Sequence, residues 1–464
     1  MDPRYRVLDD AARLAHEYID SLQARPVGAQ EGLEELRERF TRPLGDAGED
    51  PRSVIADLAR DADPGLIASG GPRYFGFVIG GALPVAVAAD WLTSAWDQNT
   101  GGFVVAPALS VIEEVAAGWV RDVLGLPPQS SIGFVTGCQM AHFTCLAAAR
   151  HAVLRDAGWD VEAQGLQGAP EVRVVAGANA HVTVQVACRM LGLGAERVRE
   201  VATDDQGRML VEALRAELER YSGPTIVCAQ AGEINTGAFD PFDAIVDACR
   251  ERGAWCHVDG AFGLWAAASP SRRGLIAGFE RADSWATDGH KWLNVPYDSG
   301  IAAVADASAH RAAMTSTSAY IPAHEEDIPW GFDWNPEFSR RARGVAVYAA
   351  LRALGRSGVA DLVDRCCDHA VRMASLLSAG DGVEILNDVV LNQVLVRFGD
   401  SDELTNAVIE RVQRDGVCWL SGSSFRGRAV MRVSVVGWQT TAEDVERSAD
   451  AILAAVPERL EQSR

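Results

Sequence analysis

The sequence predicts an α/β protein built on a mostly parallel sheet with covering helices. Between residues 130 and 305, short apolar runs alternate with segments of helical spacing, the order expected when strands are joined by crossover helices. The runs Thr225–Gln230 and Ala254–Val258 are mostly apolar, which is typical of strands buried on both faces. A helix is predicted between them over Phe242–Arg252, and further strands over 172–177 and 299–305.

The bulk composition excludes several classes of protein. The chain has 464 residues, which predicts two or three structural parts, and its net charge of −21 argues against nucleic-acid and anionic-membrane partners. The nine cysteines are odd in number and form no CxxC pair, which suits neither a disulfide framework nor a zinc site. The first residues lack an apolar signal core, and no apolar run is long enough to span a bilayer. We therefore expect a cytoplasmic protein with reduced thiols, no membrane or nucleic-acid partner and no bound metal.

The stretch from Trp255 to Trp292 carries the chemistry. Its first strand brings Asp259 to the carboxyl edge of the sheet, where open α/β folds bind ligands. A second predicted strand, Ala282–Ala286, is followed shortly by Lys291. A lysine held between a glycine-histidine pair and a tryptophan is expected to be desolvated, which lowers the pKa of the amine and keeps it nucleophilic.

Taken singly, each of these two residues has an ordinary explanation. An aspartate after a strand is usually a turn or capping residue, and a lysine is usually solvated. Together they suggest a carbonyl cofactor held by the lysine as a Schiff base, with the acid paired to a ring nitrogen, as pyridoxal 5′-phosphate (PLP) is held.

The motifs HVDGAFG (257–263) and DGHKW (288–292) resemble those of the group II PLP-dependent amino-acid decarboxylases, whose fold is fold type I. The resemblance implies a mostly parallel seven-stranded sheet with covering helices, in which 299–305 is the candidate for an antiparallel member. It also implies a smaller C-terminal α+β domain. We divide the chain accordingly into an N-terminal helical arm (1–85), a large PLP-binding domain (86–345) and a small C-terminal domain (346–464).

The strand-to-helix turn at Gly137 is the predicted phosphate site, because the first amides of a helix and its dipole favour anions. We expect backbone contacts from Gly137, Cys138 and Gln139. The family builds this turn from Gly, Ser and Ala, so Cys138, Gln139 and His142 depart from its pattern. The alternative is a plain strand-to-helix turn without a ligand.

The resemblance assigns three further contacts with PLP. His181, after the strand at 172–177, matches a histidine that stacks on the pyridine ring, although a capping or core histidine is the alternative. Ala261, two residues after Asp259, is expected to contact the cofactor, and His290 is expected to support Lys291 and the phosphate.

Tyr320 lies in an irregular segment after the lysine. In the family, a mobile loop at this distance carries a tyrosine that reaches the neighbouring subunit's site and protonates the product carbon, and Tyr320 is similar in context. An ordinary packing residue is the alternative. The resemblance implies a homodimer with its active sites at the interface. Helices expected over residues 5–68 either wrap a second subunit or pack on their own domain.

The function implied is the decarboxylation of a small-molecule L-amino acid to the amine and carbon dioxide. The expected catalytic residues are Lys291, Asp259, His181 and Tyr320. An aromatic loop containing Tyr74, Phe75 and Phe77 favours an aromatic or bulky substrate.

Two rival functions stay open. The first keeps PLP but ends in oxidative deamination to an aldehyde, or in a carbon–carbon lyase or aldol reaction; departures from the family at Cys138, Gln139, Glu233 and Asn235 leave room for it. The second is a catalytically silent binding protein of the same fold, against which the intact Lys291 and Asp259 count.

Overall fold

The computed structural model describes residues 3–315, 328 and 330–457 of the chain. It divides into two compact units, Met1–Gly80 with Arg372–Ile385 and Leu395–Arg464, and Gly81–Val371 with Leu386–Val394. The first unit thus combines the N-terminal residues with the end of the chain. The predicted division into three parts at residues 85 and 345 separates them, and that division stays a prediction. No helix of the described chain combines the length and apolar character of a membrane span.

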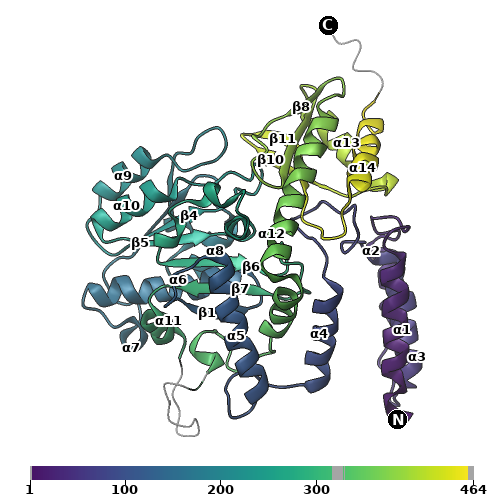
Figure 1. Ribbon diagram of the computed structural model, residues 1–464, viewed down its shortest axis with the longest axis horizontal. Coiled ribbons are helices and arrows are strands. Elements are labelled where there is room, and N and C mark those ends of the chain that lie inside the picture. The colour runs from purple at the N-terminus through teal and green to yellow at the C-terminus, as the bar shows by residue number, and fades with distance from the viewer. Residues whose placement is uncertain (1–2, 316–327, 329, 458–464) are drawn as a thin grey trace. The chain divides into compact units, whose positions relative to one another are not determined.

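The second unit contains a seven-stranded sheet of order β1-β7-β6-β5-β4-β2-β3, of which β1, β7, β6, β5 and β4 are labelled in Figure 1. β7 is antiparallel to both of its neighbours and the remaining pairs are parallel, which confirms the predicted sheet and its antiparallel strand. The strands are β1 (Ser131–Val135), β2 (Arg173–Gly177), β3 (Arg199–Val201), β4 (Thr225–Gln230), β5 (Trp255–Asp259), β6 (Ser284–Asp288) and β7 (Gly300–Val304).

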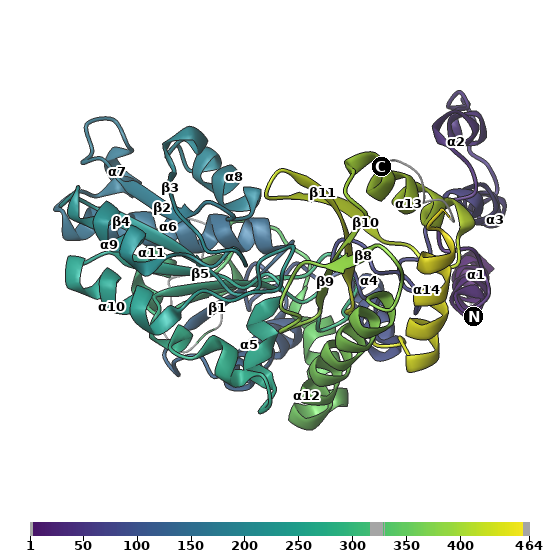
Figure 2. The ribbon, with the colours of Figure 1, turned by 90° about the horizontal axis from the view of Figure 1, so that it is seen from above.

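Helices pack on both faces of this sheet (Figure 2). His257 on β5 contacts α6, whereas its neighbour Cys256 points the opposite way, toward Cys249 of α10, because successive strand side chains alternate between faces. The helices of the unit are α4 (Pro84–Trp96), α5 (Pro107–Leu124), α6 (Cys138–Asp156), α7 (Val161–Gln164), α8 (Val182–Met190), α9 (Val211–Glu219), α10 (Phe242–Arg252) and α11 (Ala307–Met314).

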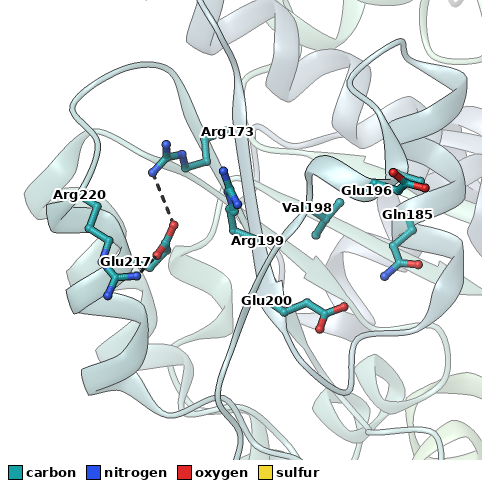
Figure 3. Close-up of a pocket in the computed structure, with 9 residues that line it drawn as sticks. Arg173, Gln185, Glu196, Val198, Arg199, Glu200, Glu217 and Arg220 are labelled. Carbon is teal, nitrogen blue, oxygen red and sulfur yellow. Dashed lines mark hydrogen bonds and ion pairs between the residues drawn. The ribbon is translucent and has the colours of Figure 1, made fainter.

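A surface hollow of about 840 Å³ lies at the amino-terminal ends of β2 and β3. It is lined by charged side chains that largely pair with one another, such as Arg173 and Arg220 with Glu217 (Figure 3). Because open α/β sheets bind ligands at the carboxyl ends of their strands, we assign no site to this hollow.

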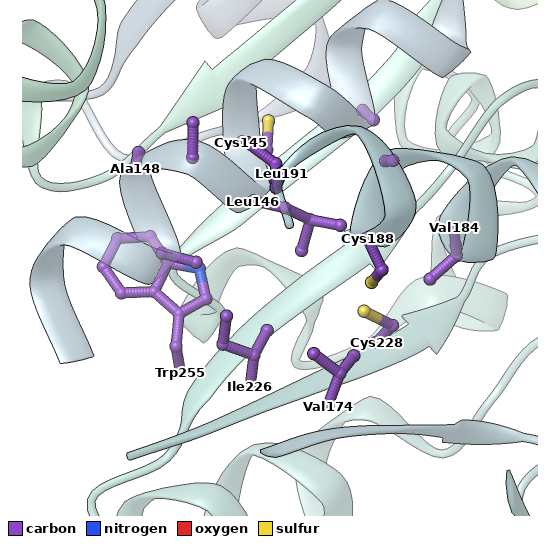
Figure 4. Close-up of a cluster of buried hydrophobic side chains, with 14 of the residues drawn as sticks. Cys145, Leu146, Ala148, Val174, Val184, Cys188, Leu191, Ile226, Cys228 and Trp255 are labelled. Atoms are coloured by element: carbon purple, nitrogen blue, oxygen red, sulfur yellow. The ribbon is translucent and has the colours of Figure 1, made fainter. Parts of the chain in front are cut away.

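The core of the unit lies between the sheet and the helices α6 and α8 (Figure 4). Three successive alanines, Ala147 to Ala149, are fully or almost fully buried and keep α6 thin enough to lie close to the strands. Larger side chains such as Leu146 and Trp255 fill the space around them.

The first unit contains an antiparallel sheet of order β10-β11-β9-β8 with helices α13 and α14, the α+β arrangement expected for the C-terminal part. Its N-terminal helices α1 and α3 contact each other, and all three N-terminal helices lie within the range 5–68 predicted to be helical. The elements are α1 (Arg6–Ser21), α2 (Leu33–Phe40), α3 (Pro51–Ala62), β8 (Val383–Ile385), α13 (Asp402–Asp415), β10 (Ser421–Phe425), β11 (Arg428–Ser434) and α14 (Ala442–Ala454). α12 (Gly344–Leu377) and β9 (Gln393–Phe398) belong partly to each unit.

A buried ion pair connects distant parts of the second unit. The guanidinium of Arg340 donates to both carboxylate oxygens of Glu113 on α5, at 2.6 and 3.0 Å, and to the carbonyl oxygen of Phe134 at the end of β1. The second oxygen of Glu113 also accepts from the amide of Gly344, the first residue of α12. The pair therefore fixes α5, β1 and the start of α12 relative to one another.

Replacing Glu113 with Gln should destabilise the protein by about 3–5 kcal/mol, because Arg340 would stay buried without a counter-charge. Urea denaturation followed by tryptophan fluorescence measures the loss. The control is Asp122→Asn, which breaks the pair with Arg356, in which both side chains are about two-thirds exposed, and should cost less than about 1 kcal/mol. Equal effects of the two substitutions would contradict the assignment.

Candidate active site

The carboxyl ends of β4, β5 and β6 meet at one cavity of about 250 Å³. The register places Asp259, the last residue of β5, between Gln230 and Ala286, and Asp288 is the last residue of β6. The cavity brings together all the predicted site residues that the structure describes. Its lining consists of Gly137, Cys138, Gln139, His181, Thr183, Gln230, Gly232, Ile234, Asp259, Ala261, Phe262, Asp288, His290 and Lys291.

Lys291 lies beside a carboxylate that the sequence analysis did not assign. Its Nζ is 3.1 Å from Oδ2 of Asp288, which is almost completely buried. Burial lowers the pKa of Lys291, but the charge and hydrogen bond of Asp288 outweigh it, so the pKa is raised. The predicted lowering was therefore wrong in sign: desolvation acts as expected, but a buried counter-charge overrides it.

The turn before α6, the predicted phosphate site, contacts a side-chain carboxylate of the protein itself. The amide of Cys138, the first residue of α6, donates to Oδ1 of Asp288 at 2.6 Å. A Cβ on Gly137 would lie 3.2 Å from Cε1 of His290, so the turn approaches the lysine segment closely only because residue 137 is glycine. On the far side, Gly300 packs directly against Gly137. The exposed side chain of Gln139 lies at the cavity.

Asp259 is buried at the inner end of the cavity. Its Oδ1 accepts a hydrogen bond from the amide of Ala261 at 3.1 Å and lies 3.5 Å from Nε2 of His142. Burial raises the pKa of Asp259, but the imidazoles of His142 and His181 and the amide of Ala261 together outweigh it, and the pKa is lowered. The carboxylate is therefore charged at neutral pH.

His181 is both a capping residue and a lining residue of the cavity. It is the N-cap of α8, where its Nδ1 accepts from the amide of Thr183 at 3.4 Å and lies 2.8 Å from the Thr183 hydroxyl. With Nδ1 used as an acceptor, a neutral imidazole carries its proton on Nε2. The cap thus fixes the ring orientation at the cavity wall.

His290 is held from two sides. Its Nδ1 accepts from the amide of Ser299 at 3.1 Å, and its ring stacks on Tyr297 with centroids 4.2 Å apart. Burial lowers the pKa of His290, so the imidazole is neutral at pH 7, and its Nε2 lies 3.4 Å from Asp288. Asp288 therefore has a cation, an imidazole and a backbone amide around it.

Some residues singled out from the sequence lie elsewhere. Tyr320 is outside the described residues. Glu233 turns back on its own loop, where it accepts from the amides of Asn235 and Thr236 at 2.7 Å, so these polar residues stabilise a turn beside the cavity. In the first unit, Tyr74 is buried and stacked on Trp419, Phe75 is fully buried, and Phe77 is 56% exposed.

Two signals in the sequence could have sharpened the site. Lys291 is the only lysine in the 464-residue chain, so no other side chain offers a primary amine. The strand predicted to end at Ala286 continues to Asp288, which puts this acid at the same sheet edge as Asp259.

A family model described as the pyridoxal-dependent decarboxylase conserved domain matches residues 34–398. The chain belongs to this family. It is accordingly a PLP-dependent carboxy-lyase, an enzyme that decarboxylates an amino acid with PLP as its cofactor.

Curated relatives cover most of the chain at modest identity. An aromatic-L-amino-acid decarboxylase of Bacillus atrophaeus is 26% identical over 450 residues, covering 94% of this chain and 92% of that protein. An L-2,4-diaminobutyrate decarboxylase of Rhizobium meliloti is 27% identical, covering 88% and 83%. Among solved structures, Oryza sativa TDC with PLP and tryptamine superposes with a TM-score of 0.92 at 22% identity and covers 99% of both chains. The fold of the chain is thus that of PLP-dependent decarboxylases.

The cavity fits PLP. It contains the chain's single primary side-chain amine for the aldehyde, a carboxylate held as an anion for the ring nitrogen, and a helix start whose amide already contacts an anionic oxygen. The glycine at 137 leaves the room that a side chain would fill.

Asp288→Asn should speed the capture of PLP by the cofactor-free enzyme at pH 7. Removing the negative charge lowers the pKa of Lys291, so a larger fraction of the amine is neutral and reactive at any pH below that pKa. Stopped-flow absorbance of PLP binding measured from pH 6 to pH 9 should show the rate rising at lower pH than in the wild type. The control is Asp298→Asn, an acid of the same loop paired with Arg343. A slower or unchanged rate in Asp288→Asn would contradict this role.

Proposed function

We propose that this enzyme decarboxylates an aromatic or otherwise bulky L-amino acid to the amine. The α-carboxylate leaves as carbon dioxide and a proton takes its place at Cα. The observation that carries the proposal is the single cavity that contains Lys291, Asp259 and His181 in a member of the decarboxylase family.

PLP, when bound, withdraws electrons from the bonds at Cα of the attached amino acid. Lys291 would hold its aldehyde carbon, and the charged Asp259 would hold the ring nitrogen in its protonated form. His181 and Ala261 would contact the ring. The phosphate would meet the first turn of α6 at Gly137, Cys138 and Gln139, with His290 beside it.

The lining of the cavity supports an apolar or aromatic substrate over an acidic one. Among the described residues that line it, Lys291 is the only lysine or arginine, and its amine is already engaged by Asp288. An acidic substrate side chain would meet no cation there, whereas Phe262 and Ile234 offer apolar contact. Relatives are named for aromatic and for acidic amino acids alike, so the preference rests on the lining of the cavity.

We also propose that the enzyme works as a homodimer in the cytoplasm, with its active sites at the interface. Large apolar side chains are exposed on the N-terminal helices of the first unit and on α4 and α5 of the second, and exposed apolar patches mark sites of interaction. These are Leu8, Ile19, Val54 and Leu58 on α1 and α3, and Trp91, Leu92, Trp96, Val104, Val105, Val111 and Val115 on and between α4 and α5. Sedimentation of the holoenzyme measures the oligomeric state.

Lys291→Ala should abolish decarboxylation and the visible absorbance of bound PLP. Because the chain has no second lysine, borohydride reduction of the wild-type holoenzyme should attach PLP to the peptide that contains Lys291, and peptide mass spectrometry locates it. Lys291→Arg keeps the charge beside Asp288 without a primary amine and should behave like the alanine variant. Normal turnover by either variant would overturn the assignment.

Tyr320→Phe tests the identity of the product. If the Tyr320 hydroxyl supplies the proton to Cα, its removal should divert product from the amine toward the aldehyde, with oxygen consumed. Product mass spectrometry with a Clark electrode measures both, across a panel of aromatic, acidic and basic amino acids. The wild type releasing aldehyde would favour the oxidative alternative, and an unchanged product ratio in the variant would remove Tyr320 from the mechanism.

A further inference from the structure

A line of buried hydrogen bonds runs from Asp259 into the core, on the side away from the cavity. Nε2 of His142 lies 3.5 Å from Asp259, Nδ1 of His142 lies 2.9 Å from Nε2 of His257, and Nδ1 of His257 lies 2.9 Å from the hydroxyl of Ser284. The same hydroxyl is 2.9 Å from Nε1 of Trp255. Both imidazoles and the Ser284 side chain are completely buried.

The line has one direction, because the charged carboxylate at its near end only accepts and the indole at its far end only donates. Trp255 donates to Ser284, so the Ser284 hydroxyl proton is available for Nδ1 of His257. Burial lowers the pKa of His257 to about 3, so this ring is neutral and its one proton lies on Nε2, facing His142. His142 then accepts at Nδ1 and presents its Nε2 proton to Asp259.

The spacing of the line follows from the strand. Trp255, His257 and Asp259 occupy alternate positions of β5 and therefore face the same side, toward α6, and Ser284 is opposite His257 in the β5–β6 register. His142 lies one helical turn after Cys138 on α6, which brings the imidazole of His142 within 3.5 Å of the Cys138 thiol.

We propose that His257 and His142 are positioning residues which, through this one-way line of donors, keep Asp259 charged and oriented toward the ring nitrogen of PLP. The proposal rests on the proposed role of Asp259. It extends the site to buried residues of β5 and α6 that do not line the cavity.

Burying the imidazoles of His142 and His257 in the core costs free energy, so we expect these side chains to have a role at the site. Two imidazoles in an apolar core lose their hydration, and a buried polar group costs free energy unless it is hydrogen-bonded. Apolar residues could fill this space between α6 and the sheet, which is otherwise lined by apolar side chains and cysteines. His142 also stands in the turn region where the resemblance implies small or hydroxyl-bearing residues.

The charge of Asp259 depends on every titratable group that faces it. A donor lost from His142 leaves fewer groups to offset the burial of the carboxylate, so the pKa of Asp259 rises and its charge is lost at a higher pH on acidification. The groups that face Asp259 are Cys138 and His142 from α6, Cys228 from β4, His181 before α8, and Lys291 after β6, with Asp288 beyond the lysine.

The test is the PLP dissociation constant of the protein as a function of pH, from pH 5 to pH 8.5, followed by the fluorescence and visible absorbance of bound PLP. In His257→Phe the affinity should match the wild type at pH 8 and be about tenfold weaker at pH 5.5, the size expected for losing a hydrogen bond to a charged group. His257→Gln, whose side-chain amide can donate to His142, should restore the profile. Ser284→Ala is a smaller change that removes the hydroxyl which fixes the tautomer of His257. It should change the pH dependence of PLP affinity in the same direction as His257→Phe.

The matched control is His310→Phe. His310 is also completely buried and also contacts a serine hydroxyl through Nδ1, at 2.8 Å from Ser131, but on α11 away from Asp259. The His310→Phe substitution should lower the stability of the protein without changing the pH dependence of PLP affinity. A profile in His257→Phe that coincides with the wild type, or weakens equally at every pH, or is matched by His310→Phe, would overturn the proposal.

Asp259→Asn separates this inference from the assignment on which it depends. If Asp259 pairs with the ring nitrogen, this variant should weaken PLP binding at every pH. No effect of Asp259→Asn would refute the role of the aspartate itself. A large effect there with none in His257→Phe would refute the line of donors alone.

Discussion

The structure of the site depends on how buried charge is balanced around one amine. Lys291 and Asp288 form a close pair in a pocket from which water is largely excluded, and Asp259 lies at the inner end of the same cavity. Each carboxylate has partners besides the lysine. Asp288 contacts a helix amide and a histidine, and Asp259 contacts a loop amide and a histidine. Buried charges are tolerated when such partners accompany them.

This balance also gives the two acids different tasks. The oxygen of Asp288 that meets the amide of Cys138 occupies the direction in which that helix start attracts anions. A phosphate at the same amide would lie beside the Asp288 carboxylate, which is paired with Lys291. Asp259, by contrast, has its neighbouring donors on the core side, which leaves the cavity side for the ring. One acid therefore controls the amine, and the other controls the charge of the ring.

Much of the fold could be predicted, because local runs of apolar residues and helical spacing in the sequence encode its strands and helices. β4 and α10 have the predicted bounds, and the antiparallel strand after the lysine lies within the predicted range. That Asp259, His181 and Gly137 line one cavity could be predicted, because each of them ends a strand or starts a helix. Asp288 was not assigned because the end of β6 was placed two residues early, and the sign of the pKa shift of Lys291 then followed from burial alone.

Contacts between distant segments could not be predicted, since no local pattern encodes them. The pairing of Glu113 with Arg340 joins residues 227 positions apart, and that of His142 with His257 joins residues 115 apart. In the aromatic loop, composition suggested substrate contacts where the structure shows packing. Tyr74 and Phe75 are both buried inside their own unit. Burial of an aromatic side chain releases free energy wherever it occurs, so composition alone does not separate packing from binding.

The use of arginine elsewhere in the chain agrees with a special role for Lys291 in the cavity. Ion pairs throughout the described residues are made with arginine, and the one lysine is kept for the cavity. Arginine forms bidentate pairs such as that with Glu113 and stays charged at any physiological pH, so it suits structural roles. A lysine can lose its proton when its surroundings change, and Asp288, by raising the pKa of Lys291, keeps that proton in place until another group takes over the charge. The acid beside the amine therefore favours the protonated, less nucleophilic form of Lys291.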